Sequence, residues 1–225
     1  MKQKRSKIIA AGILLAAIVL VIFSIISRFS YKETSIKRPR NAYKKKIEQF
    51  KSATDKDGDG IDDQSDILKS ALEYIQTKPK YESRYYIGGS PDDGYGVCTD
   101  VVAMGLKGAG YDLQKLVAED IKEHKDDYDI KVADSNIDYR RVRNLQVYFK
   151  NNTKSLSTDI SKIEEWQGGD IVIFKKHIGI VSDRRDKNGV PYIIHHGSKI
   201  QRAYEQNYLK GKADEIVGHY RSVSY

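Results

Sequence analysis

Cysteine is almost missing from this sequence, since its 225 residues include only one, Cys98. A single cysteine excludes a framework of internal disulfides. The sequence also lacks an internal repeat, a low-complexity run, a glycine-rich phosphate-binding loop and ligands at the spacing of a zinc site. An exported protein with one thiol must either bury it or use it, so the role of Cys98 becomes the main question.

Basic charge is also missing from most of the chain, although the net charge is +8. Residues 1–28 carry five basic and no acidic groups, and residues 29–51 carry eight basic and two acidic groups. The remaining 174 residues have 26 basic and 29 acidic groups, a net charge of −3. This balance excludes the basic face of a nucleic-acid-binding protein. The N-terminal basic residues suit contact with anionic lipid or wall polymer.

The N-terminal region contains one long uncharged run, from Ile8 to Ile26. Its 19 residues would span about 28 Å as a helix, which is enough to cross the hydrocarbon core of a bilayer. No small-residue cleavage pattern follows Ile26. We therefore expect residues 1–28 to form a cytoplasmic tail and a single-pass membrane anchor, and residues 29–51 to form a basic stalk outside the cell. A cleaved signal peptide is the alternative.

Residues 52–68 contain a twelve-residue acidic loop with glycine at position 6 and carboxylates at positions 1, 3, 5, 9 and 12. Calcium takes six to eight oxygen ligands, which such a loop and one backbone carbonyl can supply. The loop resembles those of EF-hands and, more closely, the calcium repeats of dockerins and thrombospondin type 3 modules. A structural calcium site of extracellular-grade affinity is expected, and a solvated acidic linker is the alternative. The predicted ligands are Asp55, Asp57, Asp59, Ile61 through its carbonyl, Asp63 and Asp66.

Apolar residues after Cys98 recur at helical spacing and end at Gly108 and Gly110, which predicts a short, mostly buried helix. Cys98 would then lie at the N-terminus of this helix. The positive end of the helix dipole and the free backbone N–H groups lower a thiol pKa there, and the same groups suit an oxyanion. Taken alone, a cysteine in this position is more often a packing residue.

Two histidines follow on predicted strands. Residues 168–181 indicate two β-strands joined by a tight turn, with His177 opening the second strand and Gly179 leaving room for a close neighbour. Residues 190–197 indicate a third strand ending in His195 and His196. A cysteine at a helix start and histidines on two adjacent strands are the nucleophile, base and orienting residue of cysteine hydrolases.

These motifs carry a family resemblance over Lys69 to Arg221. The order of tyrosine with a glycine pair, helix-start cysteine, and histidines on two strands resembles papain-like cell-wall hydrolases of the NlpC type. The segments around Cys98, Asn136 to Leu145, His195 and Gly218 to Arg221 resemble a bacterial domain-of-unknown-function family, number 1287, of that superfamily. The resemblance implies Cys98 as nucleophile, His177 as base, His195 as the residue orienting His177, and Tyr85 as a tyrosine reaching toward the nucleophile.

The sequence departs from the NlpC-type signature at Val97 and Thr99, which flank the cysteine. Residues 112–165 form an insert that is expected to shape the substrate groove. His196 stays an alternative to His195, because successive strand residues face opposite ways. Val142, Leu145 and Phe149 fall at helical spacing, and Arg140, Arg141 and Arg143 are expected largely on the other faces of that helix, in solvent. The alternative is that one of these arginines holds a substrate carboxylate. An amphipathic helix over residues 67–75 is expected, capped by Ser65 or Asp66.

The sequence therefore predicts an α+β fold of the papain-like, NlpC type over residues 69–225, with a helix bearing Cys98 packed on an antiparallel sheet. The expected activity is that of a membrane-anchored extracytoplasmic cysteine amidase or endopeptidase acting on a cell-wall peptide through a thioester. No organic cofactor is implied. An acyltransferase with the same chemistry is one alternative. A calcium-dependent surface binding module without activity is another, and the 16 tyrosines suit stacking on sugar or peptide under either reading.

Overall fold

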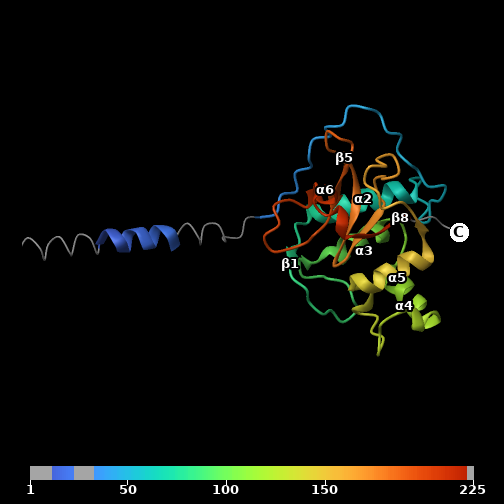
Figure 1. Cartoon of the computed structure of the whole chain (residues 1–225). Helices are drawn as coiled ribbons and strands as arrows, with labels where there is room; N and C mark the ends of the chain where they lie inside the picture. Colours follow the sequence, from blue (N-terminus) through green and yellow to red (C-terminus); the bar gives the residue numbers. More distant parts are fainter. Residues whose placement is uncertain (1–11, 23–32, 222–225) are drawn as a thin grey trace, which may run out of the picture. The chain divides into compact units, whose positions relative to one another are not determined.

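The computed structural model describes residues 12–22 and 33–221, which belong to two units, Met1–Glu33 and Thr34–Tyr225 (Figure 1). Residues 12–22 form a helix. The predicted anchor extends beyond that helix to Ile8 and Ile26, which lie outside the described residues, as do most of the tail and the start of the stalk. Within the described residues, no helix combines the length and apolarity needed to cross a bilayer.

The second unit is built on a six-stranded sheet in which every neighbouring pair is antiparallel. This arrangement confirms the mixed α and β composition and the antiparallel sheet predicted from the sequence. In spatial order the strands are β3 (Lys154–Ser155), β8 (Ile216–Arg221), β4 (Ile171–Phe174), β5 (His177–Arg185), β6 (Pro191–Ile194) and β7 (Glu205–Gln206).

Both faces of the sheet are buried, which explains why β4 reads as a continuous apolar run. Alternate residues enter two cores. Ile171 and Ile173 face the core that contains the helices, whereas Val172 and Phe174 face a smaller core with Trp166. The sheet is therefore a central layer, and its strand ends can bring distant residues together.

The helices are α2 (Asp63–Gln76), α3 (Cys98–Gly108), α4 (Leu113–Glu123), α5 (Val142–Asn152) and α6 (Tyr208–Gly211). Short 3₁₀ turns cover Lys125–Asp127, Asp138–Arg140 and Ala213–Glu215, and β1 (Lys80–Tyr81) pairs in parallel with β2 (Tyr95–Gly96). Helix α2 packs most extensively on α3, and α3 packs on β5 (Figure 1). The pair α2 and α3 thus fixes the cysteine against the strand that begins with His177.

A glycine makes this close packing possible. A Cβ atom on Gly105 would lie 2.6 Å from Cδ1 of Ile180 on β5 and 3.1 Å from the carbonyl oxygen of Ile67 on α2. No side chain fits between the helix pair and the sheet at that point.

The predicted amphipathic helix is confirmed as α2, but its cap is Asp62. The Asp62 carboxylate accepts hydrogen bonds from the N–H groups of Ser65 and Ser52.

The basic segment after Thr34 is not a separate stalk. The Arg38 guanidinium bonds Glu205 at 2.9 and 3.0 Å and also contacts Asp183. Further along, the Phe50 N–H donates to Gln167 at 3.1 Å. The folded unit therefore begins near Thr34 rather than at residue 69. Charge composition misplaced this boundary, because basic side chains can pair with acidic groups far along the chain.

The insert at residues 112–165 supplies α4, α5 and β3. The predicted helix with Val142, Leu145 and Phe149 is confirmed, and its apolar face enters the main core. Helix α5 packs on β8 and α4 packs on α5. The insert is thus an integral part of the domain core, and its role in shaping a substrate groove stays a prediction.

Candidate active site

Cys98 is the first residue of α3, as the sequence predicts. The preceding Val97 is extended, and its N–H donates to a carboxylate oxygen of Asp100 at 2.7 Å, which closes the first turn of the helix. The thiol side chain is almost buried, with the residue 9% exposed. The backbone N–H groups of Ile178 and Thr99 lie close enough to its sulfur to favour the thiolate. The sulfur therefore lies directly beside the start of β5.

The environment of Cys98 reverses the expected direction of its pKa shift. Burial raises the pKa of the thiol to about 11, the backbone N–H of Ile178 acts to lower it, and the Asp100 carboxylate raises it further. The helix-start N–H groups do favour the thiolate, but the cost of burying its charge is larger. Cys98 is consequently a neutral thiol at pH 7, and the lowered pKa predicted from the sequence is wrong.

The two predicted histidines meet at the end of the sheet. His177 Nε2 lies 2.8 Å from His195 Nδ1, and His195 Nε2 lies 3.0 Å from the side-chain oxygen Oε1 of Gln206. A Cβ atom on Gly179 would lie 2.6 Å from Ile193 Cγ2 and 3.2 Å from His195 Cβ, so glycine there permits the close approach of β6. His177 on β5, His195 directly after β6, and Gln206 on β7 thus form one hydrogen-bonded chain across three neighbouring strands.

Gln206 determines where the protons of this chain lie. Its Oε1 only accepts hydrogen bonds, so His195 must carry its proton on Nε2 and present an unprotonated Nδ1. His177 must then donate from Nε2 to that Nδ1. In a neutral His177, the remaining nitrogen Nδ1 holds a free lone pair. His177 Nδ1 is therefore available to accept a proton. The next residue in the chain, Ile178, lies beside the Cys98 sulfur.

Both imidazoles are neutral at pH 7. Burial lowers the pKa of His177 to about 4, with a smaller effect from His196. Burial also lowers the pKa of His195 to about 3, and the charge that His177 would carry lowers it further. Together with the neutral thiol, these shifts describe a resting thiol and imidazole rather than a thiolate–imidazolium ion pair. His177 would act as a general base on an intact S–H group.

His196 lies apart from this chain, as expected for alternating strand residues. Its ring packs edge-on against Tyr81 and Tyr204, at centroid distances of 5.2 and 5.1 Å. Among the described residues its Nδ1 has no hydrogen-bond partner. The structure brings His195, and not His196, into contact with His177.

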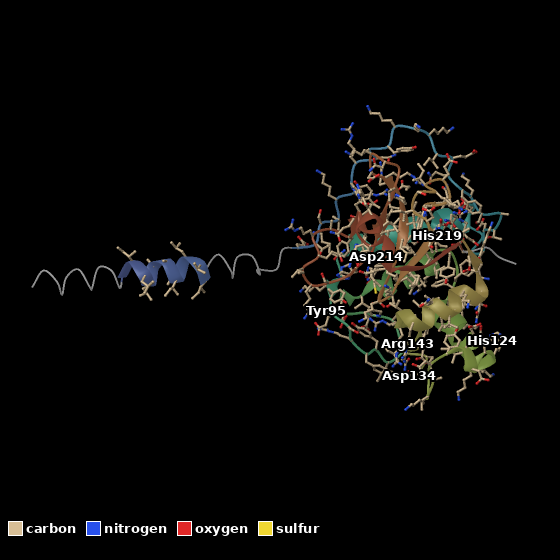
Figure 2. All side chains as sticks on the ribbon, viewed as in Figure 1. Tyr95, His124, Asp134, Arg143, Asp214 and His219 are labelled. Atoms are coloured by element: carbon tan, nitrogen blue, oxygen red, sulfur yellow. The ribbon has the colours of Figure 1, made fainter. Side chains whose placement is uncertain are left out.

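Tyr85 does not reach the cysteine. Its hydroxyl donates to Asp134 and accepts from Asn136, both at 3.0 Å, and the residue is 56% exposed. Figure 2 labels Asp134 in the lower part of the domain. Two tyrosines that the sequence analysis did not select lie nearer the thiol. Burial raises the pKa of both Tyr81 and Tyr208, and the Cys98 charge raises each further.

Tyr208 also packs on the histidine chain. Its ring centroid lies 5.2 Å from that of His177 and 4.7 Å from that of His195. Gln206 lies on the two-residue strand β7 and Tyr208 opens the four-residue helix α6, and elements this short leave no periodic signal in the sequence. Only the strand order of the sheet reveals them, because β7 lies beside β6.

Of the three arginines considered for substrate binding, Arg140 is already occupied. Its guanidinium bonds both oxygens of Asp100, at 2.7 and 2.8 Å, and donates to the carbonyl of Arg84 at 2.6 Å. Arg140 and Asp100 are both buried, so this pair anchors the first turn of α3. Arg143, which Figure 2 labels, instead forms an exposed ion pair with Asp129 at 3.1 Å. Arg140 is therefore neither a solvated residue nor a free carboxylate clamp.

The motif at Gly218 to Arg221 has a structural role. Arg221 bonds both oxygens of the fully buried Asp170, at 2.7 and 2.8 Å, and His219 Nε2 lies 2.9 Å from the same carboxylate. The His219 ring stacks on Trp166 at a centroid distance of 3.8 Å. This cluster joins β8 to the start of β4.

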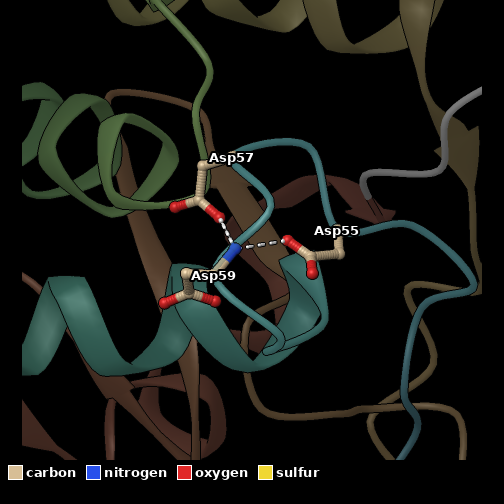
Figure 3. Close-up of side chains that lie close together, drawn as sticks. All are labelled: Asp55, Asp57 and Asp59. Carbon is tan, nitrogen blue, oxygen red and sulfur yellow. Dashed lines mark hydrogen bonds between the residues drawn. The ribbon is translucent and has the colours of Figure 1, made fainter.

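The acidic loop brings together only part of the predicted ligand set. Oxygens of Asp55, Asp57 and Asp59 lie within 4.8 Å of one another at the surface (Figure 3). Asp63 instead accepts hydrogen bonds from the Thr54 hydroxyl, the Lys56 N–H and the Tyr111 hydroxyl. The N–H of Ile61 donates to Asp59 at 2.8 Å. Asp66 is buried in the first turn of α2.

Comparison with known proteins places residues 68–222 within a family described as Domain of unknown function (DUF1287). Among curated proteins, the chain is similar to the uncharacterized protein YijF of Escherichia coli (strain K12). The two are 39% identical over 153 residues, which make up 64% of this chain and 72% of the relative. The matched region agrees with the Lys69 to Arg221 segment predicted from its motifs.

Proposed function

This chain belongs to the DUF1287 family, and we propose that it is an extracytoplasmic cysteine amidase or endopeptidase. Peptidoglycan stem peptides are its proposed substrates, because the order of its motifs resembles NlpC-type cell-wall hydrolases. The observation that carries the proposal is the hydrogen-bonded chain from His177 through His195 to Gln206, which starts on the strand whose second residue, Ile178, lies beside the Cys98 sulfur. A nucleophile, a base and an orienting residue in this order support acyl-transfer chemistry.

The first proposed step starts from the neutral pair. His177 Nδ1 takes the thiol proton while the Cys98 sulfur attacks the carbonyl carbon of a substrate amide. The backbone N–H groups at the start of α3 donate to the oxyanion that develops on the carbonyl oxygen. His177 then returns the proton to the leaving amine as the carbon–nitrogen bond breaks, which leaves a thioester on Cys98.

The second step regenerates the enzyme. His177 takes a proton from water, the resulting hydroxide attacks the thioester carbonyl, and the carbon–sulfur bond breaks. The carboxylic acid product leaves and Cys98 recovers its proton. His195 stabilises the protonated His177 because its unprotonated Nδ1 faces His177 Nε2. Gln206 keeps His195 in that tautomer.

The papain-like fold and the location are also parts of this proposal. A helix-start cysteine packed on an antiparallel sheet, with one histidine opening β5 and another directly after the neighbouring β6, supports the fold assignment. The uncharged run from Ile8 to Ile26 supports a single-pass anchor in the cytoplasmic membrane, with the folded unit outside the cytoplasm. Calcium has no part in the chemical steps of this proposal.

An acyltransferase with the same residues is a second candidate. The specific observation in its favour is the burial of Cys98, with Tyr81 and Tyr208 close to the sulfur. A thioester shielded from bulk water lasts longer, which allows an amine or alcohol to replace water as the acceptor. The two candidates share the first step and differ only in the second.

The proposal is tested with the full-length protein in detergent micelles and purified wall fragments, with products identified by mass spectrometry. Hydrolysis produces new amine and carboxyl termini, whereas transfer joins two fragments without adding water. Cys98→Ala and His177→Ala should abolish either product, while His196→Phe, outside the hydrogen-bonded chain, should retain it. Product formation that survives Cys98→Ala would refute the mechanism. Binding of fragments without any product would favour the surface binding module.

A further inference from the structure

The first residues of the folded unit lie beside the segment that carries the second histidine. The Thr34 hydroxyl donates to the carbonyl of Gln201, 167 residues later, at 3.1 Å. Ser35 forms an isolated parallel bridge with Ala203. Figure 1 shows this blue segment passing beside the orange-red end of the chain. Both residues lie outside the family match at 68–222, so the family motifs do not reveal what they do.

The loop that this segment contacts supports the histidine pair. The Gln201 side-chain amide donates to the carbonyls of His195 and Ala203, at 2.8 and 2.7 Å. Its oxygen accepts the N–H of Gly197. A Cβ atom on Gly197 would lie 3.3 Å from both His177 Cε1 and His195 Nδ1. The loop backbone therefore packs against the point where the two rings meet, and Gln201 fixes it there.

Arg38, a few residues further on, reaches the other side of the histidine chain. Its guanidinium forms a fork of two hydrogen bonds with the Glu205 carboxylate, from Nε at 2.9 Å and from Nη2 at 3.0 Å. The Glu205 side chain is 2% exposed and also accepts a hydrogen bond from the Ser182 hydroxyl. Among the residues that the structure describes, Arg38 is the only positive partner of this buried carboxylate.

Glu205 is followed directly by Gln206, the residue that accepts the hydrogen bond of His195. These two residues make up β7, which is the last strand at one edge of the sheet. Successive strand residues face opposite sides, so the fork holds Glu205 on one face while Gln206 meets His195 on the other. A strand this short pairs with β6 at only two positions. Arg38 supplies a further anchor that fixes the direction of both side chains.

We propose that Arg38 is a positioning residue for the base His177. By holding Glu205 on one face of β7, Arg38 keeps Gln206 in place on the other face. Gln206 in turn keeps the hydrogen bond to His195 Nε2, and so the acceptor that His177 needs. Arg38 touches no reacting atom and acts only through these residues. The inference rests on the proposed function, in which His177 is the base.

Proton NMR of the full-length protein in detergent micelles, with isotope-labelled histidine, tests this role without any substrate. An imidazole N–H proton gives a resolved signal only while a hydrogen bond and burial protect it from exchange with water. The wild type should give one protected signal from His195 Nε2 and one from His177 Nε2. Gln206→Leu should lose the His195 signal, which identifies it.

The variants separate the fork from the charge that it neutralises. Arg38→Ala alone leaves Glu205 buried without its partner, which can unfold the protein. The double variant Arg38→Ala, Glu205→Gln removes both, so it should keep a cooperative thermal melt and lose the His195 signal. Arg38→Lys, which cannot bond both oxygens at once, should keep that signal in part. Arg40→Ala, at an exposed arginine nearby in the sequence, should keep both signals and full turnover.

Turnover of wall fragments gives a second readout. The double variant should lower kcat by up to about 100-fold, as for a catalytic group misplaced by about 1 Å, and leave KM unchanged. In a Gln206→Leu background it should lower kcat no further, because both changes act through one contact. A folded double variant that keeps the His195 signal would overturn the role of Arg38. A wild type that shows both protected signals but converts no fragment would refute the proposed function instead, while the NMR comparison would still decide the role of Arg38.

Discussion

Because Cys98 and His177 are both neutral at pH 7, the alkylation rate of Cys98 should depend on pH differently from that of a cysteine in a thiolate–imidazolium ion pair. Only the thiolate attacks iodoacetamide, so the alkylation rate follows the fraction of Cys98 that is ionised. An ion pair between Cys98 and His177 would produce a plateau of rate at neutral pH. The buried neutral thiol should instead show a rate that keeps rising with pH.

The expected size of the effect follows from the pKa of about 11. At pH 7 about one Cys98 in 10,000 would be ionised, compared with about 3% of an ordinary thiol with a pKa of about 8.5. Alkylation at pH 7 should therefore be about 300-fold slower than that of a small free thiol. The rate should then rise about tenfold per pH unit until the pH approaches 11.

The assay is simple because the chain contains one cysteine. The full-length protein is incubated with iodoacetamide at several pH values, and the alkylated fraction is read by intact mass spectrometry beside a free thiol. His177→Ala should not slow the reaction at neutral pH, because no ion pair is lost. The matched control is His196→Phe, which leaves the hydrogen-bonded chain of His177 untouched.

A plateau of alkylation below pH 8.5 in the wild type, lost in His177→Ala, would refute this reasoning and restore the lowered thiol pKa expected from the sequence. Turnover should show a different pH dependence. Since the pKa of His177 is lowered to about 4, the base stays unprotonated above that value. Activity should decline only when the pH falls toward 4.

Further predictions concern stability and topology. Burial lowers the pKa of His177, His195 and His196, so these groups stabilise the fold fully above about pH 6.5, and the stabilisation is lost as the pH falls toward 4. Melting temperature should drop across that window, and His196→Phe should reduce the drop because it removes one buried imidazole. Arg140→Ala should destabilise the protein by about 3 to 5 kcal/mol in urea unfolding, because it leaves Asp100 buried without its partner, whereas Arg143→Ala should change stability by less than about 1 kcal/mol. Gly179→Ala should cost about 1 to 3 kcal/mol and reduce turnover by separating β5 from β6, while Gly211→Ala, where a Cβ meets nothing within 4 Å, should do neither. Protease added to intact cells should remove the folded unit, and complete protection until lysis would contradict the proposed location.

The sequence by itself determined the local elements around the site. Apolar spacing and the glycines at 108 and 110 specify the helix that starts at Cys98, because both signals act within a few residues. The hairpin whose second strand begins at His177 follows in the same way from two dense β-branched runs and a short turn. The family was also recognisable, because motifs of several residues carry it.

The tertiary structure decided which of these residues work together and with what charge. His195 rather than His196 contacts His177, and Gln206 sets their tautomers, because strand register and strand order are not local properties. The thiol pKa rises because the core closes over Cys98, a burial cost that helix-start chemistry alone does not include.

The remaining corrections have the same origin in long-range contacts. Arg38 pairs with Glu205 across 167 residues, so a segment that charge composition assigns to a stalk belongs to the fold. Asp63 accepts a hydrogen bond from Tyr111 and Asp66 is buried with one oxygen unpaired, although both occupy ligand positions in the loop pattern. Residue spacing specifies the direction in which a side chain leaves a local element. How far that side chain is desolvated, and which partners it contacts, depends on distant parts of the chain that only folding brings near.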